Sequence, residues 1–420
     1  MKIVFVLECA NRLNNGTTAT CLRFADELRK RGHDVVLIGE GYDGADASFY
    51  VGLEHFKFPV YEKLISREGF NFVKIDLVKI YNAIKDADLI HLFLPFKLSK
   101  VAQLIADPLG IPVSSAFHMQ PQNVTSAINL GNAKLVNNAL YSSFKRYLYN
   151  YTKNVHCPSE MIANQLREHG YDRNKFWVIS NGVNSYFHPV PAEKPAELKD
   201  KYIVLMSGRL AGEKRQDLII KAVAASKYNE KIQVILCGQG PAKAHYEKLS
   251  VKMGLKNPLI IKFCNAEELR QALNFCDLYV HASDFEIEGI SCIEAFACGA
   301  VPVISDSKLS ATNTFALDKQ CIFKHGNVSS LKHRINYFYE NPQERDRLSK
   351  EYVEYAKSFA LSNQVDKMEE FVQAAVEDKK KGEDIPTLYP RKKDIRRSRK
   401  IFKKLLKAGA IHEMPMSLKK

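Results

Sequence analysis

Short runs of apolar residues alternate along the chain with longer stretches whose apolar residues recur at helical spacing. Residues 3–7 form the first run, residues 19–31 follow with a helical pattern, and residues 35–38 form the next run. The same order starts again at residues 202–206, with a helical pattern after it. Strands that alternate with helices predict parallel sheets covered by helices on both faces. We therefore predict an α/β protein with two Rossmann-like domains.

One stretch of the second half, residues 284–302, reads DFEIEGISCIEAFACGAVP and combines a glycine loop with an apolar helix. Apolar strands precede and follow it. A loop at the carboxyl end of a parallel strand, followed by a helix N-terminus, is a place where phosphate binds. Gly289 lets a ligand approach the backbone, and the carboxylates of Glu286 and Glu294 accept hydrogen bonds from sugar hydroxyls. The stretch therefore predicts a nucleotide-sugar site.

The same stretch resembles the signature of retaining GT-B glycosyltransferases of the GT4 type. The resemblance lies in two glutamates separated by seven residues and in Ala295, Ala297, Cys298, Gly299 and Pro302. It implies two Rossmann-like domains that face a central cleft. It also implies that Glu286 holds the donor sugar and Glu294 the ribose, while amides around Gly289 and Ile290 stabilise the leaving diphosphate. The alternative is a helix N-terminus whose acids only favour the helix dipole.

Three other segments carry candidate residues for this site. Arg209 and Lys214, in a G-R-L-x-x-E-K segment after a strand, are cations suited to a diphosphate. His118 directly follows the strand at residues 112–117 and could donate to a sugar hydroxyl and stabilise an oxocarbenium-like transition state. The resemblance implies that the loop containing Gly16 contacts donor phosphates. The alternatives are solvated charges, a structural histidine and a bare turn.

Other sequence features argue against a metal, a disulfide framework and a membrane span. Asp86 and Asp88 match a D-x-D metal motif, but they precede an interior strand, whereas ligands bind at carboxyl ends of strands. We therefore predict no catalytic metal and no cofactor. Nine cysteines without a C-x-x-C pair indicate reduced thiols of a cytoplasmic protein. No apolar run approaches the roughly 20 residues of a span, and the N-terminus is typical of a strand rather than a signal peptide. Residues 307–312 have no assignable role.

The positive charge of the chain is concentrated at its C-terminus. The net formal charge is +14, and residues 379–420 hold 15 Lys/Arg against 4 Asp/Glu, a net +11. Within residues 391–407, ten of seventeen positions are basic, while Ile395, Phe402, Leu405 and Leu406 recur near helical spacing. Such a helix can lie in a membrane interface, apolar face down and cations toward anionic headgroups. The alternative is a solvated or disordered end, and no aromatic interleaving favours nucleic-acid binding.

We predict an N-terminal Rossmann-like acceptor domain at residues 1–185, a nucleotide-sugar domain at residues 186–378 and a basic amphipathic tail at residues 379–420. The resemblance, which extends to bacterial diacylglycerol glucosyltransferases, implies a peripheral cytoplasmic hexosyltransferase that acts with retention. Its donor would be a nucleotide-sugar, first UDP-glucose, and its acceptor a membrane lipid such as 1,2-diacylglycerol. The anionic membrane surface would bind residues 391–407. Alternatives are a polysaccharide or polyprenyl-linked acceptor, or a non-catalytic nucleotide-sugar-binding subunit.

Overall fold

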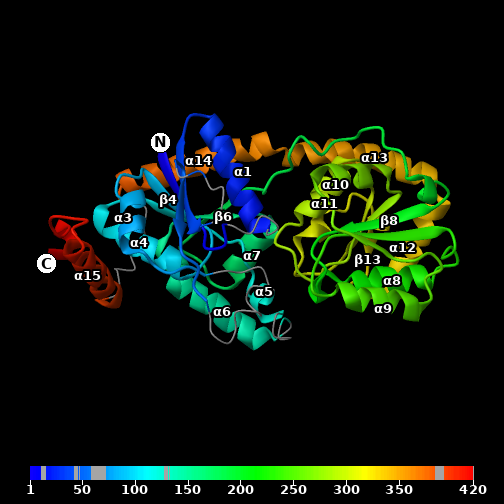
Figure 1. Ribbon diagram of the computed structural model, residues 1–420, viewed down its shortest axis with the longest axis horizontal. Helices are drawn as coiled ribbons and strands as arrows, with labels where there is room; N and C mark the ends of the chain where they lie inside the picture. Colours follow the sequence, from blue (N-terminus) through cyan, green and yellow to red (C-terminus); the bar gives the residue numbers. More distant parts are fainter. Residues whose placement is uncertain are drawn as a thin grey trace. The chain divides into compact units, whose positions relative to one another are not determined.

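The chain folds into two compact units, each built on one parallel sheet (Figure 1). The first unit combines Met1–Ile179 with Gln364–Lys420, and the second is Ser180–Asn363. The computed structural model describes residues 1–10, 16–41, 46, 48–57, 72–126, 131, 133–383 and 392–419. The two Rossmann-like sheets predicted from the sequence are confirmed.

The sheet of the first unit has seven parallel strands in the order β3-β2-β1-β4-β5-β6-β7. Their bounds are β1 Lys2–Val6, β2 Asp34–Glu40, β3 Tyr50–Leu53, β4 Leu89–Leu92, β5 Val113–Ala116, β6 Asn154–Cys157 and β7 Lys175–Val178. Four of the five residues of β1 (KIVFV) are buried, because helices cover both faces of the sheet. Ile3 pairs with Val35 of β2 and with Leu89 of β4, so the strand order reverses beside β1. Ligands of such sheets bind outside the carboxyl ends of the strands at this reversal.

Helices pack on both faces of the first sheet, with one additional layer outside them. Their bounds are α1 Gly16–Lys30, α3 Leu77–Ile84, α4 Lys97–Leu109, α5 Pro121–Thr125, α6 Lys134–Tyr147, α7 Glu160–Glu168, α14 Leu361–Lys380, α15 Lys392–Lys407 and α16 Met416–Lys419. In Figure 1, α1 and α14 cover one face and α3 and α4 the other. The outer layer is α15, which packs against α3 and α4.

The second unit repeats the same winding with six strands in the order β10-β9-β8-β11-β12-β13. The strands are β8 Tyr202–Ser207, β9 Ile232–Cys237, β10 Ile260–Lys262, β11 Leu278–His281, β12 Pro302–Ser305 and β13 Ile322–Phe323. The helices are α8 Gln216–Ala224, α9 Lys243–Met253, α10 Ala266–Phe275, α11 Ile290–Ala297, α12 Val328–Glu340 and α13 Pro342–Ala356. Here the strand order reverses between β8 and β11, so the ligand-binding position is beside the loops that follow these two strands.

The boundaries of the compact units differ from those of the predicted domains, because only the first three residues of α14 belong to the second unit. The chain crosses between Ile179 and Ser180 and again between Asn363 and Gln364. The rest of α14 belongs to the first unit: the Phe371 ring lies 5.3 Å from the His91 ring of β4, and Asp378 pairs with Lys153 at 2.9 Å. Residues 364–378 therefore pack with the N-terminal sheet, although the predicted nucleotide-sugar domain, residues 186–378, included them.

The tail forms the predicted amphipathic helix, α15, but the centre of its apolar face is covered by protein, while Leu406 is 41 % exposed. Phe402 and Leu405 are fully buried against α3 and α4, and the Phe402 ring lies 6.3 Å from the Tyr81 ring. Asp394 accepts a hydrogen bond of 2.5 Å from the Tyr151 hydroxyl, and Ser398 donates to the Leu104 carbonyl at 2.9 Å. The prediction that this apolar face lies down in a membrane is therefore wrong, since it packs on the first unit.

The described part of the chain holds no helix that is long and apolar enough to cross a membrane. It also holds no group of three or more histidine, cysteine or acidic side chains arranged to bind a metal ion. The backbone N–H of Lys2, where β1 starts, donates to Asp88 at 2.7 Å, so the D-x-D sequence lies at the amino edge of the sheet, as predicted.

Candidate active site

The first turn of α11 presents backbone amides at the carboxyl edge of the second sheet. Gly289 precedes the helix with φ +96°, a left-handed conformation that favours glycine. A Cβ at this position would lie 2.2 Å from Cγ2 of Thr312, so no side chain fits there. The first N–H groups of a helix have no acceptor within it, and they lie at the positive end of its dipole. The turn at Gly289 and Ile290 can therefore bind an anionic group.

Glu286 lies in the loop before this helix and is held by two side chains from other segments. The Lys214 ammonium donates to Oε1 of Glu286 at 2.5 Å, and Nε2 of His281 lies 3.1 Å from the same oxygen. Burial raises the pKa of the Glu286 carboxyl, but Lys214 and His281 outweigh it and hold the pKa well below its ordinary value. Glu286 is therefore an ionised acceptor that can bind sugar hydroxyls.

Residues 307–312, which had no assigned role, form the support behind this loop. The Glu286 carbonyl accepts a hydrogen bond from the N–H of Ala311 at 2.9 Å, and the Ser307 hydroxyl donates to the Asp284 carbonyl at 2.7 Å. The methyl group of Thr312 occupies the space that a side chain at position 289 would need. This segment therefore fixes the position of the Glu286 backbone and determines how closely a ligand can approach Gly289.

Arg209 and Lys214 follow β8, as the sequence predicts, and the structure places β8 next to β11 in the sheet. The Arg209 guanidinium donates to Glu213 at 2.5 Å, and the Arg209 carbonyl accepts from the side chain of Gln216 at 2.9 Å. A Cβ on Gly238 would lie 1.9 Å from the Gly208 carbonyl oxygen, so two loops approach each other closely beside Arg209. The structure therefore gathers Arg209, Lys214, Glu286, Gly289 and Ile290 within one unit.

Glu294 lies one turn inside α11, half-buried, at the spacing that the sequence predicted. The residues between Glu286 and Glu294 contain a further buried carboxylate, Glu288, that sequence reasoning did not single out. Oε2 of Glu288 accepts from the N–H of Asn181 at 3.0 Å. Glu288 thus ties the start of the second unit to this loop.

His118 lies at the carboxyl edge of the first sheet, just after β5. It is 5 % exposed, and neither ring nitrogen has a hydrogen-bond partner among the described residues. Its ring packs 4.9 Å from the His156 ring and 5.6 Å from the Phe93 ring. Burial, together with the neighbouring His156 and His91, lowers the pKa of His118 well below its ordinary value. His118 is therefore a neutral hydrogen-bonding group, so the predicted stabilisation of charge would come from its dipole.

A second buried carboxyl, Glu8, follows β1 and was missed by sequence reasoning. It is 1 % exposed, and Oε1 accepts from the Leu98 N–H at the start of α4 at 2.9 Å. Burial raises the pKa of Glu8 to about 7, because the amides of Leu98 and Ser99 offset only part of its effect. An acid directly after a buried strand was the signal that could have identified it.

Gly16 is the first residue of α1. A Cβ at Gly16 would meet no atom within 4 Å, and the Gly16 carbonyl accepts from the Thr20 hydroxyl at 2.8 Å. The preceding residues of its loop, 11–15, lie outside the described part of the chain. Its assignment to donor phosphates stays a prediction.

Two family profiles together match most of the chain. The profile described as "Glycosyltransferase Family 4" matches residues 14–186, and the profile described as "Glycosyl transferases group 1" matches residues 191–356. This chain belongs to the GT4 family. It is a nucleotide-sugar-dependent glycosyltransferase with the GT-B fold, and enzymes of this family generally need no metal ion for the transfer.

Curated relatives of this GT4 chain act on different sugars. A GDP-mannose-dependent alpha-mannosyltransferase of Corynebacterium glutamicum is 27% identical over 317 residues, 72% of each chain. An alpha-monoglucosyldiacylglycerol synthase of Streptococcus pneumoniae is 23% identical over 309 residues, 69% of this chain and 68% of the relative. These are distant relationships, so they do not define the donor or acceptor of this chain.

Solved structures show the same fold. Sucrose-phosphate synthase of Thermosynechococcus elongatus is 17% identical and covers 89% of this chain and 98% of its own, with a TM-score of 0.72. Anabaena HepE, solved with UDP and glucose, is 16% identical and covers 89% of this chain and 100% of its own, with a TM-score of 0.68. The GT-B fold predicted from the GT4 signature is thereby confirmed.

Proposed function

We propose that this glycosyltransferase moves a hexose, with UDP-glucose as the first candidate donor, to a hydroxyl of a membrane lipid such as diacylglycerol. The observation that carries the proposal is the ionised Glu286 carboxylate, paired with Lys214 beside the amides of Gly289 and Ile290. A carboxylate for sugar hydroxyls stands there next to a cation and amides for a diphosphate. Diacylglycerol is supported by the name of the Streptococcus pneumoniae relative.

In the proposed reaction, the acceptor oxygen forms a bond with C1 of the hexose while the bond from C1 to the β-phosphate oxygen breaks. The hydroxyl proton passes to the departing diphosphate. Attack from the face that the diphosphate leaves retains the configuration at C1, and no carboxylate nucleophile is needed.

Lys214 and Arg209 would stabilise the charge of the departing diphosphate. An ammonium has three N–H donors, so Lys214 can donate to Glu286 and still reach a phosphate oxygen. The guanidinium of Arg209 has five N–H donors, of which Glu213 accepts one. Each carboxylate therefore holds its cation in place before the donor binds, which reduces the ordering that binding requires.

The sugar and the ribose would be held by the remaining predicted residues. Glu286 would accept hydrogen bonds from the hexose, and Glu294 from the ribose. His118 would donate to the hexose as a neutral imidazole, and Gly16 would lie near the donor phosphates.

The enzyme would work on the cytoplasmic face of the membrane, to which α15 attaches it. The side chains of seven exposed basic residues of α15 have no hydrogen bond or ion pair with another described residue: Lys392, Lys393, Arg396, Lys400, Lys403, Lys404 and Lys407. A Lys or Arg close to an anionic surface contributes about 1 kcal/mol. Because Phe402 and Leu405 of the apolar face are buried, this attachment would be mainly electrostatic and would weaken at high salt.

The test is product formation from a panel of UDP- and GDP-hexoses with vesicles that contain diacylglycerol. Glycolipid from one donor, with the configuration at C1 retained, is the expected result. A triple charge reversal, Lys400→Glu with Lys403→Glu and Lys407→Glu, should lower vesicle binding, since it leaves the buried face of α15 intact. Donor binding without lipid product would overturn the lipid acceptor and direct the search to polysaccharide or polyprenyl-linked acceptors. Donor binding without turnover on any acceptor would indicate a non-catalytic subunit.

A further inference from the structure

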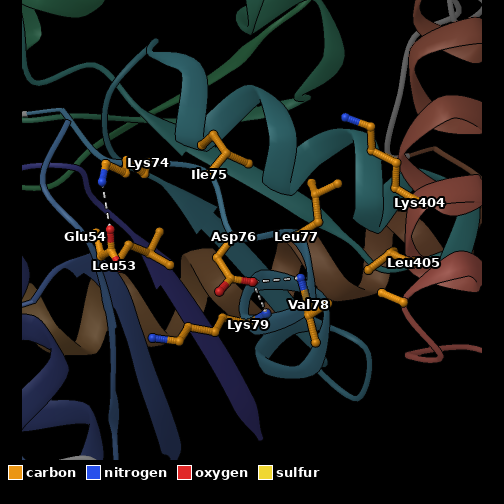
Figure 2. A pocket seen from close by; sticks show the side chains of 11 residues that line it. Leu53, Glu54, Lys74, Ile75, Asp76, Leu77, Val78, Lys79, Lys404 and Leu405 are labelled. Carbon is orange, nitrogen blue, oxygen red and sulfur yellow. Dashed lines mark hydrogen bonds and ion pairs between the residues drawn. The ribbon is translucent and has the colours of Figure 1, made fainter.

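A pocket of about 460 Å³ opens between α3 and α15 in the first unit (Figure 2). Leu53, the last residue of β3, lines it, so the pocket lies at the carboxyl edge of the sheet. Glu8 and His118 also lie at this edge, after β1 and β5. Its volume is within the range of about 300–1,000 Å³ that is usual for small-molecule sites.

The middle of the pocket is apolar. Leu77 at the start of α3 and Leu405 of α15 line it from two sides, and Ala408 follows the end of α15 (Figure 2). Leu53 and Leu405 are almost fully buried, so they form a fixed floor and not an exposed loop. Among the residues that the structure describes, none of those lining the pocket is aromatic.

The acids around the pocket are engaged within the protein, whereas one of its cations is not. Glu54 pairs with Lys74 at 2.9 Å, and Oδ1 of Asp76 accepts from the N–H groups of Val78 and Lys79 at 3.0 Å (Figure 2). The Lys404 ammonium has no hydrogen bond or ion pair with any other residue that the structure describes. The pocket therefore combines an apolar floor with a cation that is available to an anionic group.

We propose that this pocket binds an anionic phospholipid of the membrane surface, which is not itself glycosylated. The phosphate would lie at Lys404, where the exposed Lys400, Lys403 and Lys407 of the same helix add positive potential, and the acyl chains would lie over Leu77 and Leu405. The proposal rests on the proposed membrane attachment but not on the transfer reaction. A lipid bound here would keep the membrane at the edge of the sheet that carries Glu8 and His118, where a lipid acceptor would enter.

The chain supplies a matched pair of variants for the test. Lys404 lines the pocket, and its neighbour Lys403 is an exposed cation of the same helix that does not. Lys404→Glu and Lys403→Glu change the net charge equally, so they affect attraction to a charged surface alike. Binding of dihexanoyl phosphatidylglycerol, used as monomers, to the full-length protein should weaken about tenfold in Lys404→Glu and less than about threefold in Lys403→Glu, because only Lys404 loses a charge-assisted contact.

Hydrogen exchange gives an independent readout, and the bound lipid should protect residues 74–79 and 401–408. Equal weakening in both variants would overturn the proposal in favour of general electrostatic attraction. Binding of dihexanoyl phosphatidylcholine as tight as that of phosphatidylglycerol would overturn the role of the anion. Equally tight binding of inorganic phosphate, or of an oligonucleotide, would overturn the assignment of a phospholipid as the ligand of this pocket.

Transfer to detergent-dispersed diacylglycerol separates this proposal from the proposed function. Phosphatidylglycerol binding without any transfer by the unaltered protein would support the proposed lipid pocket and overturn the proposed function. Transfer without phosphatidylglycerol binding would support the proposed function and overturn the lipid pocket.

Discussion

Two carboxyl groups at the carboxyl edges of the two sheets, one buried and one with a side chain that is 13 % exposed, differ in their ionisation. Glu8 follows β1 in the first unit, and Glu286 follows β11 in the second. Burial raises the pKa of each carboxyl. At Glu8, with only amide N–H groups to oppose burial, the pKa rises to about 7. At Glu286, Lys214 and His281 more than offset burial, and the pKa falls well below its ordinary value.

This difference indicates that a cation at hydrogen-bond distance, and not backbone amides alone, keeps a largely desolvated carboxylate ionised in this protein. The second unit uses this device beside the turn that can bind a diphosphate. The first unit instead places a neutral imidazole, His118, and a carboxyl that titrates near neutrality at its edge. Such an edge suits an uncharged acceptor hydroxyl better than a phosphate.

Removing the cation should have the largest effect. In Lys214→Ala, the donor loses a charge-assisted contact of about 1.5–3 kcal/mol, and Glu286 loses its counter-charge, so kcat/KM should fall at least 100-fold. Because the pKa of Glu286 is depressed in the native protein, the acid limb of the pH profile should move to higher pH in the variant. Steady-state kinetics from pH 5 to 9 measure both effects.

Lys227→Ala is the control for this prediction. Lys227 pairs with Glu340 on an exposed surface of the same unit, so its removal should change kcat/KM less than about twofold. A loss of activity in Lys214→Ala with an unchanged pH profile would show that Glu286 stays ionised without Lys214, and the explanation of the comparison would be wrong.

The amide turn beside Glu286 can be tested by closing the space at Gly289. Gly289→Ala should lower kcat/KM more than about tenfold and destabilise the protein by roughly 2–4 kcal/mol, since Cβ would overlap Cγ2 of Thr312 in a left-handed backbone. The added substitution Thr312→Ser removes Cγ2 and should restore part of both losses. In Gly254→Ala, with φ +75° and open space, only the backbone cost of about 1 kcal/mol is expected. Equal losses of stability in Gly254→Ala and Gly289→Ala, without recovery on Thr312→Ser, would exclude the steric contact between position 289 and Thr312.

The positions of the candidate residues beside the second sheet could be predicted from sequence because the main ones are close together along the chain. Glu286, Gly289 and Glu294 fall within one loop and helix, and their spacing alone places them. The contact between Lys214 and Glu286 joins residues 72 positions apart and depends on β8 lying beside β11. The support from residues 307–312 is mostly backbone hydrogen bonding, which no side-chain pattern indicates.

The tail shows why the partner of an amphipathic helix could not be predicted. The same spacing of apolar residues serves a helix that packs on protein and one that lies on a membrane. The difference lies in Asp394, an acid in a basic helix, which accepts from Tyr151 and lies 3.7 Å from the buried Lys100 ammonium. That contact depends on the tertiary position of α4, which the sequence pattern does not contain.

The raised pKa of Glu8 can be tested through the pH dependence of the free energy of unfolding. Its pKa is about 7 in the folded protein against an ordinary value of 4.5, so its contribution is fully present below about pH 4.5 and is lost as the pH rises toward 7. The loss amounts to at most about 3 kcal/mol. Glu8→Gln keeps an acceptor for Leu98 and should remove this pH dependence. Urea unfolding between pH 5 and 8, followed by fluorescence of Trp177, the single tryptophan of the chain, reports on the first unit. An unchanged pH dependence would mean that Glu8 is already ionised.

His118 should give the smallest effect, because a neutral imidazole contributes one hydrogen bond and no charge. His118→Ala should lower kcat/KM about tenfold, close to the cost of one lost hydrogen bond to a sugar hydroxyl. His118→Gln keeps a donor and should recover most of this loss. Since burial lowers the pKa of His118 well below its ordinary value, the kinetics of the unaltered protein should show no titration from this residue between pH 6 and 8. Such a titration, abolished in His118→Gln, would show that the imidazole acts as a cation. The contrast between a charged donor edge and a neutral edge around His118 would then be wrong.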